Sequence, residues 1–329
     1  MYSNAQTTGS AVFKTLNTYS SARIAGLAGN QIAVKDGDLG LAFVNPALLD
    51  SAADKRIEMS YTNYFADVNF GSVHFARQLK DIGVGAVALQ YVNLGDFDET
   101  DPSGNVLGGF NAADLIVNLG LGRKLDTNFT AGVNLKFINS TLANYSSSGI
   151  ALDFGLHYYS TKSLFSAAGL IKNVGTQLSS YTAENKEKLP FEIQLGFTKK
   201  LRHAPFRFGF IFENLQKWDI RRESEKNIVF VDPLTGEIQE DDRFVAGDIF
   251  LRHLVFNTEV LLSQNFVLRF GYNYRKRQEL ALENKPGTVG FSAGVTVKVK
   301  KFNFTYGRNT FHLAGPSNHF SINTSISEW

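Results

Sequence analysis

The feature of this sequence that most limits its fold is a strand-length alternation of apolar with small or polar residues. It is repeated roughly fourteen times between about Arg56 and Trp329, and the connections between repeats alternate between very short and long. A strand that crosses a bilayer needs apolar side chains at every second position over about 9–11 residues. Antiparallel hairpins then place short turns at one membrane face and long loops at the other. The double alternation therefore predicts a transmembrane β-barrel.

The clearest repeats alternate almost without error. In one of them Phe206, Phe208, Phe210 and Phe212 share a face, which we predict to contact lipid. Soluble strands average about 5–6 residues, whereas the repeats here run to roughly ten to fifteen, which favours the barrel over a soluble β-protein. The predicted strands are 56–65, 68–78, 82–93, 109–123, 128–140, 147–160, 164–174, 190–200, 205–215, 247–262, 266–276, 287–299, 302–309 and 318–328.

Composition narrows the remaining possibilities. The 329 residues contain no apolar run of transmembrane-helix length and no cysteine, which excludes disulfides, thiolate catalysis and cysteine-bound metals. A net charge of +2 is too small to indicate nucleic-acid binding. The first residues show neither a basic nor an apolar leader region, so we expect either a protein that is not exported or a mature form.

The first 55 residues do not alternate. They are rich in small residues, and Asn45 before Pro46 is typical of a helix N-cap with proline at the first helical position. We therefore predict two parts, an N-terminal lead-in or plug at 1–55 and an outer-membrane β-barrel at 56–329.

The phase of the connections predicts an orientation. An even number of strands places both ends of the barrel on the short-turn side, which in bacterial outer-membrane barrels is the periplasm, with the long loops extracellular. We thus expect both termini to be periplasmic. The longest connection, 216–246, contains a predicted small hairpin around Asp232-Pro233 and Thr235-Gly236.

Several segments resemble a known family. The start of the chain resembles FadL/PorV-type fourteen-stranded barrels through Arg23, Gly26, Gly29, Asp38, Asn45, Pro46 and Ala47, which form the plug motif. Longer strings resemble the PorQ family of the type IX secretion system, and these are Tyr158-Tyr159, 173–178, 200–207, 214–219, 251–256, 271–280 and 312–320.

This resemblance implies a role rather than a reaction. It implies a non-enzymatic outer-membrane anchor that holds a PorZ-like surface protein, in an attachment complex with a PorU-like sortase and a PorV-like barrel. It implies no cofactor. The alternative that the sequence leaves open is a FadL-like channel for hydrophobic small molecules, in which the plug would gate a pocket in the lumen.

Two surface regions are candidates for these contacts. Trp218, Arg221, Arg222, Phe230 and Val231 lie in or beside the longest connection, and we predict that this loop meets a partner. A second basic cluster is predicted to contact lipopolysaccharide phosphates, and it consists of Arg275, Lys276 and Arg277.

Three other patterns carry little functional signal. Gly290-Phe-Ser-Ala-Gly294 matches the G-x-S-x-G motif, but it lies in a predicted strand, whereas the motif needs a strand-to-helix turn. The acidic run from Asp96 to Asp101 lacks the spacing of a calcium loop. The six histidines are scattered, so we expect no metal site and no catalytic site.

Overall fold

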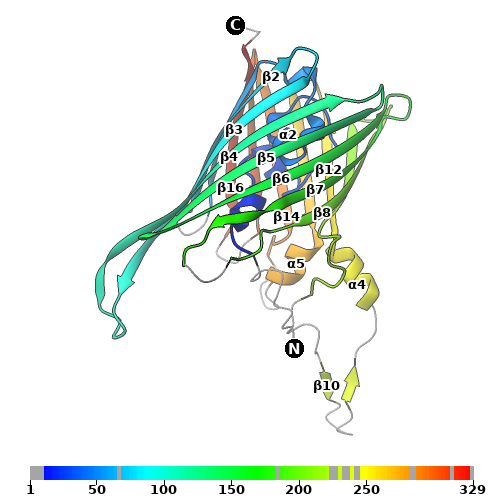
Figure 1. The fold of residues 1–329 in the computed structure, drawn as a ribbon. Helices are drawn as coiled ribbons and strands as arrows, with labels where there is room; N and C mark the ends of the chain where they lie inside the picture. Colours follow the sequence, from blue (N-terminus) through cyan, green and yellow to red (C-terminus); the bar gives the residue numbers. More distant parts are fainter. Residues whose placement is uncertain are drawn as a thin grey trace.

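The computed structural model describes residues 11–64, 68–182, 186–221, 229–231, 238–240, 245–281, 287–311 and 315–326. Fourteen antiparallel strands form one closed barrel in which each strand pairs with its sequence neighbour in the wall (Figure 1). The first and last strands close it, with Arg56 opposite Ser325 and Asn63 opposite Asn318. The predicted fold class is confirmed.

The barrel strands have the following bounds: β1 Arg56–Asn63, β2 Asn69–Leu79, β3 Gly83–Thr100, β4 Val106–Lys124, β5 Phe129–Leu142, β6 Tyr145–Ser160, β7 Phe165–Ser179, β8 Glu192–Lys200, β9 Phe206–Phe212, β12 Leu254–Leu261, β13 Phe266–Asn273, β14 Phe291–Val299, β15 Phe302–Asn309 and β16 Ser317–Ser325. A separate two-stranded hairpin, β10 Val229–Val231 with β11 Ile238–Glu240, lies between β9 and β12. It agrees with the small hairpin predicted in this connection.

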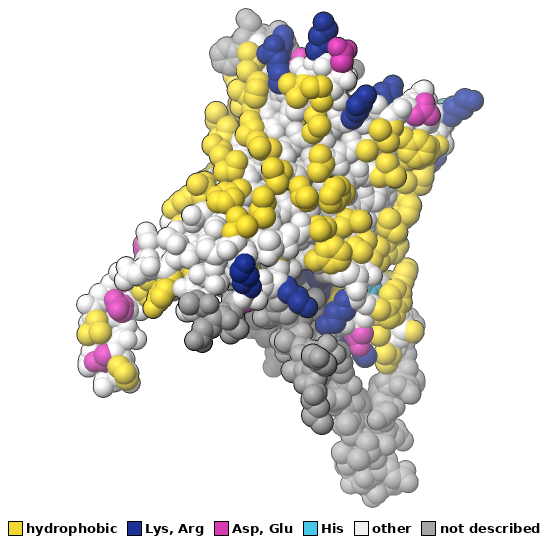
Figure 2. All heavy atoms as spheres, viewed as in Figure 1, with side chains coloured by type: hydrophobic (Ala, Val, Ile, Leu, Met, Phe, Trp, Pro, Cys, Tyr) yellow, Lys and Arg dark blue, Asp and Glu magenta, His cyan; other side chains and the backbone are white. Residues whose placement is uncertain are grey.

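Alternation gives the wall two chemically different faces. Figure 2 shows apolar side chains forming a broad band over the face of the barrel in view. A large exposed apolar surface of this kind is unfavourable in water and indicates contact with lipid. Phe206 and Phe210 are exposed, and Phe208 and Phe212 share their outward face. Other exposed apolar residues of the band include Met59, Val73, Leu89, Leu119, Leu135, Phe154, Leu195, Phe270, Phe304 and Ile322.

Several predicted boundaries are wrong. The strand predicted at 164–174 continues to Ser179 in β7, and the one predicted at 287–299 begins at Phe291 in β14. Residues 94–108, predicted as a loop, continue β3 and β4 into a long hairpin that projects from the barrel (Figure 1). The start of the predicted strand 247–262 is the helix α4 (Val245–Arg252). The end of the predicted strand 266–276 forms the first turn of α5 (Tyr274–Leu280), with Asn273 as its N-cap. Among the described residues, the ladders that β12 and β13 form with their neighbours stop before α4 and α5, so alternation there has no ladder to support it.

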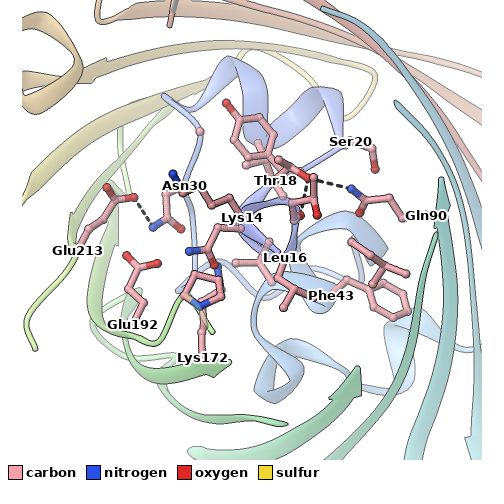
Figure 3. A pocket seen from close by; sticks show the side chains of 18 of the residues that line it. Lys14, Leu16, Thr18, Ser20, Asn30, Phe43, Gln90, Lys172, Glu192 and Glu213 are labelled. Carbon is pink, nitrogen blue, oxygen red and sulfur yellow. Dashed lines mark hydrogen bonds between the residues drawn. The ribbon is translucent and has the colours of Figure 1, made fainter. Parts of the chain in front are cut away.

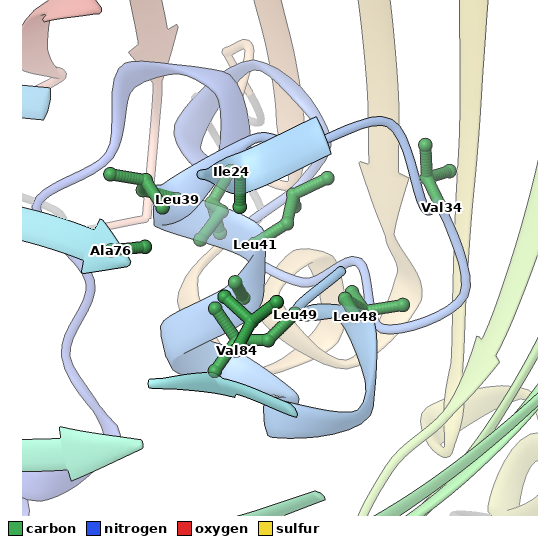
Figure 4. Close-up of a cluster of buried hydrophobic side chains, with 10 residues drawn as sticks. Ile24, Val34, Leu39, Leu41, Leu48, Leu49, Ala76 and Val84 are labelled. Atoms are coloured by element: carbon green, nitrogen blue, oxygen red, sulfur yellow. The ribbon is translucent and has the colours of Figure 1, made fainter. Parts of the chain in front are cut away.

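The N-terminal segment lies inside the barrel. It contains short helices, which are η1 Lys14–Asn17, α1 Ala22–Gly26, α2 Leu39–Val44, η2 Pro46–Leu48 and η3 Ser51–Ala53. Ile24, Leu39, Leu41 and Leu48 form an apolar core with Leu49, Val34 and the strand residues Ala76 and Val84 (Figure 4). Each buried leucine or isoleucine contributes about 1.5–3 kcal/mol, so this segment is packed rather than loosely held.

The ends of the described chain lie at opposite ends of the barrel. β16 finishes beside the start of β1, at the short-turn end, where Ile326 N–H donates to the Lys55 carbonyl. Val12 N–H instead donates to the Lys188 carbonyl in the connection after β7, which belongs to the long-loop end. The described N-terminal segment therefore enters the lumen from the long-loop end. The termini themselves, residues 1–10 and 327–329, are outside the described residues, so the prediction that both are periplasmic stays a prediction.

None of the helices in the described ranges is long and apolar enough to cross a membrane.

Candidate functional site in the barrel lumen

Glycines on the inner face of the wall let the N-terminal segment approach the strands closely. A Cβ atom added at Gly132 would lie 2.3 Å from the Pro46 carbonyl carbon, and one at Gly122 would lie 2.5 Å from Leu49 Cβ. A Cβ atom at Gly307 would lie 2.1 Å from the Ala22 carbonyl oxygen. These positions have room for a hydrogen atom only, so the wall is fitted to this segment.

Polar side chains of the wall then fasten the segment. Ala22 N–H donates to Ser321 Oγ at 2.9 Å, and Ala28 N–H donates to Ser292 Oγ at 2.8 Å. Ser292 also donates to the Gly26 carbonyl at 3.1 Å. Ser292 is the serine of the G-x-S-x-G pattern, and it holds the N-terminal segment as an inward residue of β14 rather than standing at a nucleophile elbow.

A buried group of charges, which we call the lumen ion cluster, joins the segment to three strands. Glu259 is 2% exposed and accepts from Arg23 at 3.0 Å, from Arg207 at 2.6 Å and from Arg269 at 2.9 Å. Arg23 also reaches Asp36 at 2.8 Å and Asp38 at 3.1 Å. Arg23, Asp36 and Asp38 belong to the N-terminal segment, whereas the other three members belong to β9, β12 and β13.

The electrostatics of Asp36 follow from this arrangement. Burial alone would raise its pKa, but the guanidinium charges of Arg23, Arg207 and Arg269 outweigh burial and hold the pKa below its ordinary value. The carboxylate is therefore charged at neutral pH and contributes to the attachment of the segment.

The plug-motif residues have separate structural roles. Arg23 and Asp38 belong to the lumen ion cluster, and Asp38 also caps α2 by accepting from Leu41 N–H. Asn45 caps η2 by accepting from Ala47 N–H, with Pro46 first in that helix. A Cβ at Gly29, which has φ +83°, would clash with Tyr19, and Gly26 approaches Gly294 closely.

The N-terminal segment and the surrounding wall strands enclose a cavity of about 980 Å³ (Figure 3). Its side toward the segment's packed core carries Ile24, Phe43 and Val44. The part of the cavity nearest the long-loop end is lined by charged side chains. These are Lys172, Glu192, Glu213, Arg275 and Lys276. The cavity thus has an apolar region and a charged region.

Hydrogen bonds tie parts of this lining together. Asn30 donates to Glu213 at 2.7 Å, and Gln90 donates to Thr18 at 3.0 Å (Figure 3). Two other buried lining atoms, His74 Nδ1 and Asn118 Oδ1, have no hydrogen-bond partner among the described residues.

Two helices stand at the long-loop rim. Tyr274 of α5 donates to Asp248 of α4 at 2.9 Å, and Arg252 pairs with the same carboxylate at 2.7 Å. Partial burial and the bonded Asp248 raise the pKa of Tyr274 to about 12, so the phenol remains a donor at neutral pH. Trp218 is 59% exposed and stacks on the buried His253.

The three residues of the basic cluster that was predicted to contact lipopolysaccharide, Arg275, Lys276 and Arg277, lie in different surroundings. Arg275 and Lys276 line the cavity, and Arg275 lies 3.6 Å from Glu213. Arg277 donates to the carbonyls of Gly287 and Val289. At least two of the three side chains therefore belong to the lumen, and the predicted phosphate contact remains untested.

The predicted partner loop is described only in part. Trp218 and Arg221 are described, and Arg221 pairs with Asp219 at 3.1 Å. Arg222 and the side chains of Phe230 and Val231 lie outside the described residues.

A second exposed feature was not foreseen as a site. We call residues 94–111 the arm, the part of the β3–β4 hairpin beyond the barrel wall. Its Phe97 and Phe110 are paired and stacked at 5.4 Å, and Val106 and Leu107 are 63% and 67% exposed. The sequence predicts a loop over 94–108, because the glycines and Pro102 interrupt the alternation.

The described residues contain no group of three or more His, Asp or Glu side chains that could hold a metal ion.

Comparisons with known proteins bear on the fold. No protein-family model and no curated protein matches the sequence. Among solved structures, the toluene transporter TbuX of Ralstonia pickettii is similar with a TM-score of 0.55 and 11% identity, over 95% of this chain and 100% of that one. The toluene transporter TodX of Pseudomonas putida gives 0.56 and 12%, over 93% and 96% of the two chains. A FadL homologue of Pseudomonas aeruginosa gives 0.51 and 11%, over 97% and 100%. At these identities the likeness establishes a FadL/TodX-like barrel.

Proposed function

We propose that this chain is a bacterial outer-membrane barrel that admits a small molecule with an apolar body and a polar end into its lumen. The observation that carries the proposal is the cavity of about 980 Å³, with an apolar side at Phe43 and Val44 and a charged side at Lys172 and Glu192. Its volume suits a single small ligand. The solved structures with this fold support it, because two of them are described as toluene transporters.

The N-terminal segment would control passage. The lumen ion cluster and the close glycine contacts hold it in the lumen, beside the cavity. A solute entering from the long-loop side would therefore bind in the cavity first and pass further only after the segment shifts.

Neighbouring residues of β3 provide a matched test. Ala88 is buried and lines the cavity, whereas Val87 faces outward and is 38% exposed. Binding of toluene and of benzoate to the protein in lipid nanodiscs should be measured calorimetrically. We expect Ala88→Trp to weaken binding at least tenfold, because the indole occupies the part of the cavity beside residue 88 and next to Phe43, and Val87→Trp to leave it unchanged. Equal affinities in both variants, or no binding by the parent chain, would reject the proposal.

A second candidate function is favoured by the arm. We propose that the barrel also serves as an outer-membrane anchor for a surface protein, in line with the resemblance to the PorQ family. That resemblance implies a PorZ-like partner and an attachment complex with a PorU-like sortase and a PorV-like barrel. Exposed apolar side chains on a projecting hairpin support the anchor role, because such groups commonly mark protein contacts.

The two functions make different genetic predictions. Deleting the gene should release secreted proteins from the cell surface if the chain is an anchor, and should reduce uptake of apolar solutes if it is a channel. Loss of uptake with normal surface attachment would reject the anchor.

A further inference from the structure

The arm offers backbone edges that none of the described strands covers. β2 pairs with β3 only as far as Asn93, and β5 pairs with β4 only from Ala112 inward. From Gly95 to Thr100 and from Val106 to Phe110, the two arm strands pair with each other and with no further strand in the described part of the chain. Each therefore presents unpaired N–H and C=O groups along its outer side, which can accept an added strand.

Both faces of the arm are open. A Cβ at Gly108 or Gly109 would meet nothing closer than 3.6 Å, because these glycines oppose Glu99 and Asp98 without a neighbouring layer. Phe97 is 45% exposed although it stacks on Phe110. A two-stranded ribbon of this kind is only marginally stable alone, so a covering strand would add both hydrogen bonds and apolar contact.

Charge determines what can cover it. The arm contains Asp96, Asp98, Glu99 and Asp101 and no Lys, Arg or His, and Figure 2 shows acidic and apolar side chains at its end. Four like charges oppose pairing with the same arm of a second copy, and they oppose adsorption to anionic lipid headgroups. They favour a protein surface rich in Lys and Arg.

We propose that the arm binds an extended, lysine- or arginine-bearing segment of a surface protein by strand addition. This inference rests on the anchor function and names the chemistry of its partner. The backbone edges supply the hydrogen bonds, the Phe97–Phe110 pair supplies apolar contact, and the carboxylates select a cationic segment.

The experiment uses the full chain in nanodiscs of zwitterionic lipid and a fluorescein-labelled ten-residue peptide of alternating Lys and Val. Two further peptides serve as comparisons, one with Glu in place of Lys and one with two of the Val residues replaced by Pro. Fluorescence anisotropy should show the Lys-Val peptide binding at least tenfold more tightly than either. Equal binding of the proline peptide would overturn strand addition, since proline removes ladder donors without changing charge.

Variants then locate the site. Asp96→Asn with Asp98→Asn should weaken binding of the Lys-Val peptide at least fivefold. Asp81→Asn with Asp126→Asn removes two exposed carboxylates in short turns at the opposite end of the barrel and should leave binding unchanged. Equal losses in the two double variants, or none in the first, would overturn the proposal.

An experiment in cells distinguishes strand addition at the arm from the anchor function in general. A chain whose arm is shortened to a tight turn after Asn93 should fail to hold its surface partner. If deleting the gene releases surface proteins but shortening the arm does not, the anchor function stands and the arm is not its contact.

Discussion

Removing the charge of Glu259 should free the N-terminal segment from the lumen. Glu259→Gln keeps the shape of the side chain but leaves Arg23, Arg207 and Arg269 with the carboxylates of Asp36 and Asp38 alone. Breaking a buried ion pair on one side typically costs 3–5 kcal/mol. The side chain of Asp36 is 35% exposed, so solvent screens part of the cluster, and we take the lower value of about 3 kcal/mol.

The effect can be measured as an opening equilibrium. The chain has no cysteine, so Ala42→Cys places a single thiol in the apolar core of the segment, where residue 42 is 1% exposed. A maleimide can reach it only when the segment leaves its site. A cost of about 3 kcal/mol corresponds to roughly a hundredfold increase in labelling rate, when opening is a rapid equilibrium.

The control is Asp126→Asn in the same Cys background, which removes an exposed carboxylate in the turn after β4. It should not change the labelling rate. If Glu259→Gln accelerates labelling by less than about threefold, the ion cluster does not hold the segment and the reasoning fails.

Three further predictions follow from the same geometry. Gly132→Ala should raise the Ala42→Cys labelling rate, because its Cβ would lie 2.3 Å from the Pro46 carbonyl carbon, whereas Gly71→Ala, with nothing within 4 Å, should not. Phe210→Arg should lower the unfolding free energy in liposomes by up to about 2–4 kcal/mol, because the ring is exposed on the outer face; an unchanged urea midpoint would show that this face does not meet lipid. The stabilising contribution of Asp36, whose pKa is lowered by folding, should be fully present above the ordinary Asp pKa of about 3.9 and should fall only below it. Because the thiolate is the reactive form and its population changes with pH, each labelling rate is divided by that of a chain whose single cysteine replaces the exposed Asp126. This ratio should stay constant from pH 7 to 5 and rise under stronger acid.

The wall of the barrel could be predicted because each strand carries its own signal. Period-two alternation fixes which side chains face lipid, and Phe206 to Phe212 show it without needing any partner strand. Where a strand begins and ends depends less on its own sequence and more on the strands beside it. Asp248-Ile249-Phe250-Leu251 reads as part of a strand, yet it forms α4 because β9 ends at Phe212 and leaves no ladder beside it.

The lumen site could be predicted only in part. Arg23 and Asp38 stood out through a family resemblance, but their partner Glu259 lies 236 residues from Arg23. Arg207, Glu259 and Arg269 each read as an ordinary inward polar residue, and only the register of β9, β12 and β13 shows that they meet. One sequence signal could have located this cluster. All three residues are charged, face inward and lie near the short-turn ends of neighbouring strands.

The placement of the N-terminal segment has a consequence for the order of folding. The seam between β1 and β16 joins the two ends of the barrel sequence, so it can form only after the whole chain is available. Ala22 and Ala28 are bonded to β16 and β14, the strands that arrive last. The segment can therefore act as a template on which the last strands assemble, so that the barrel is completed around its own N-terminal part.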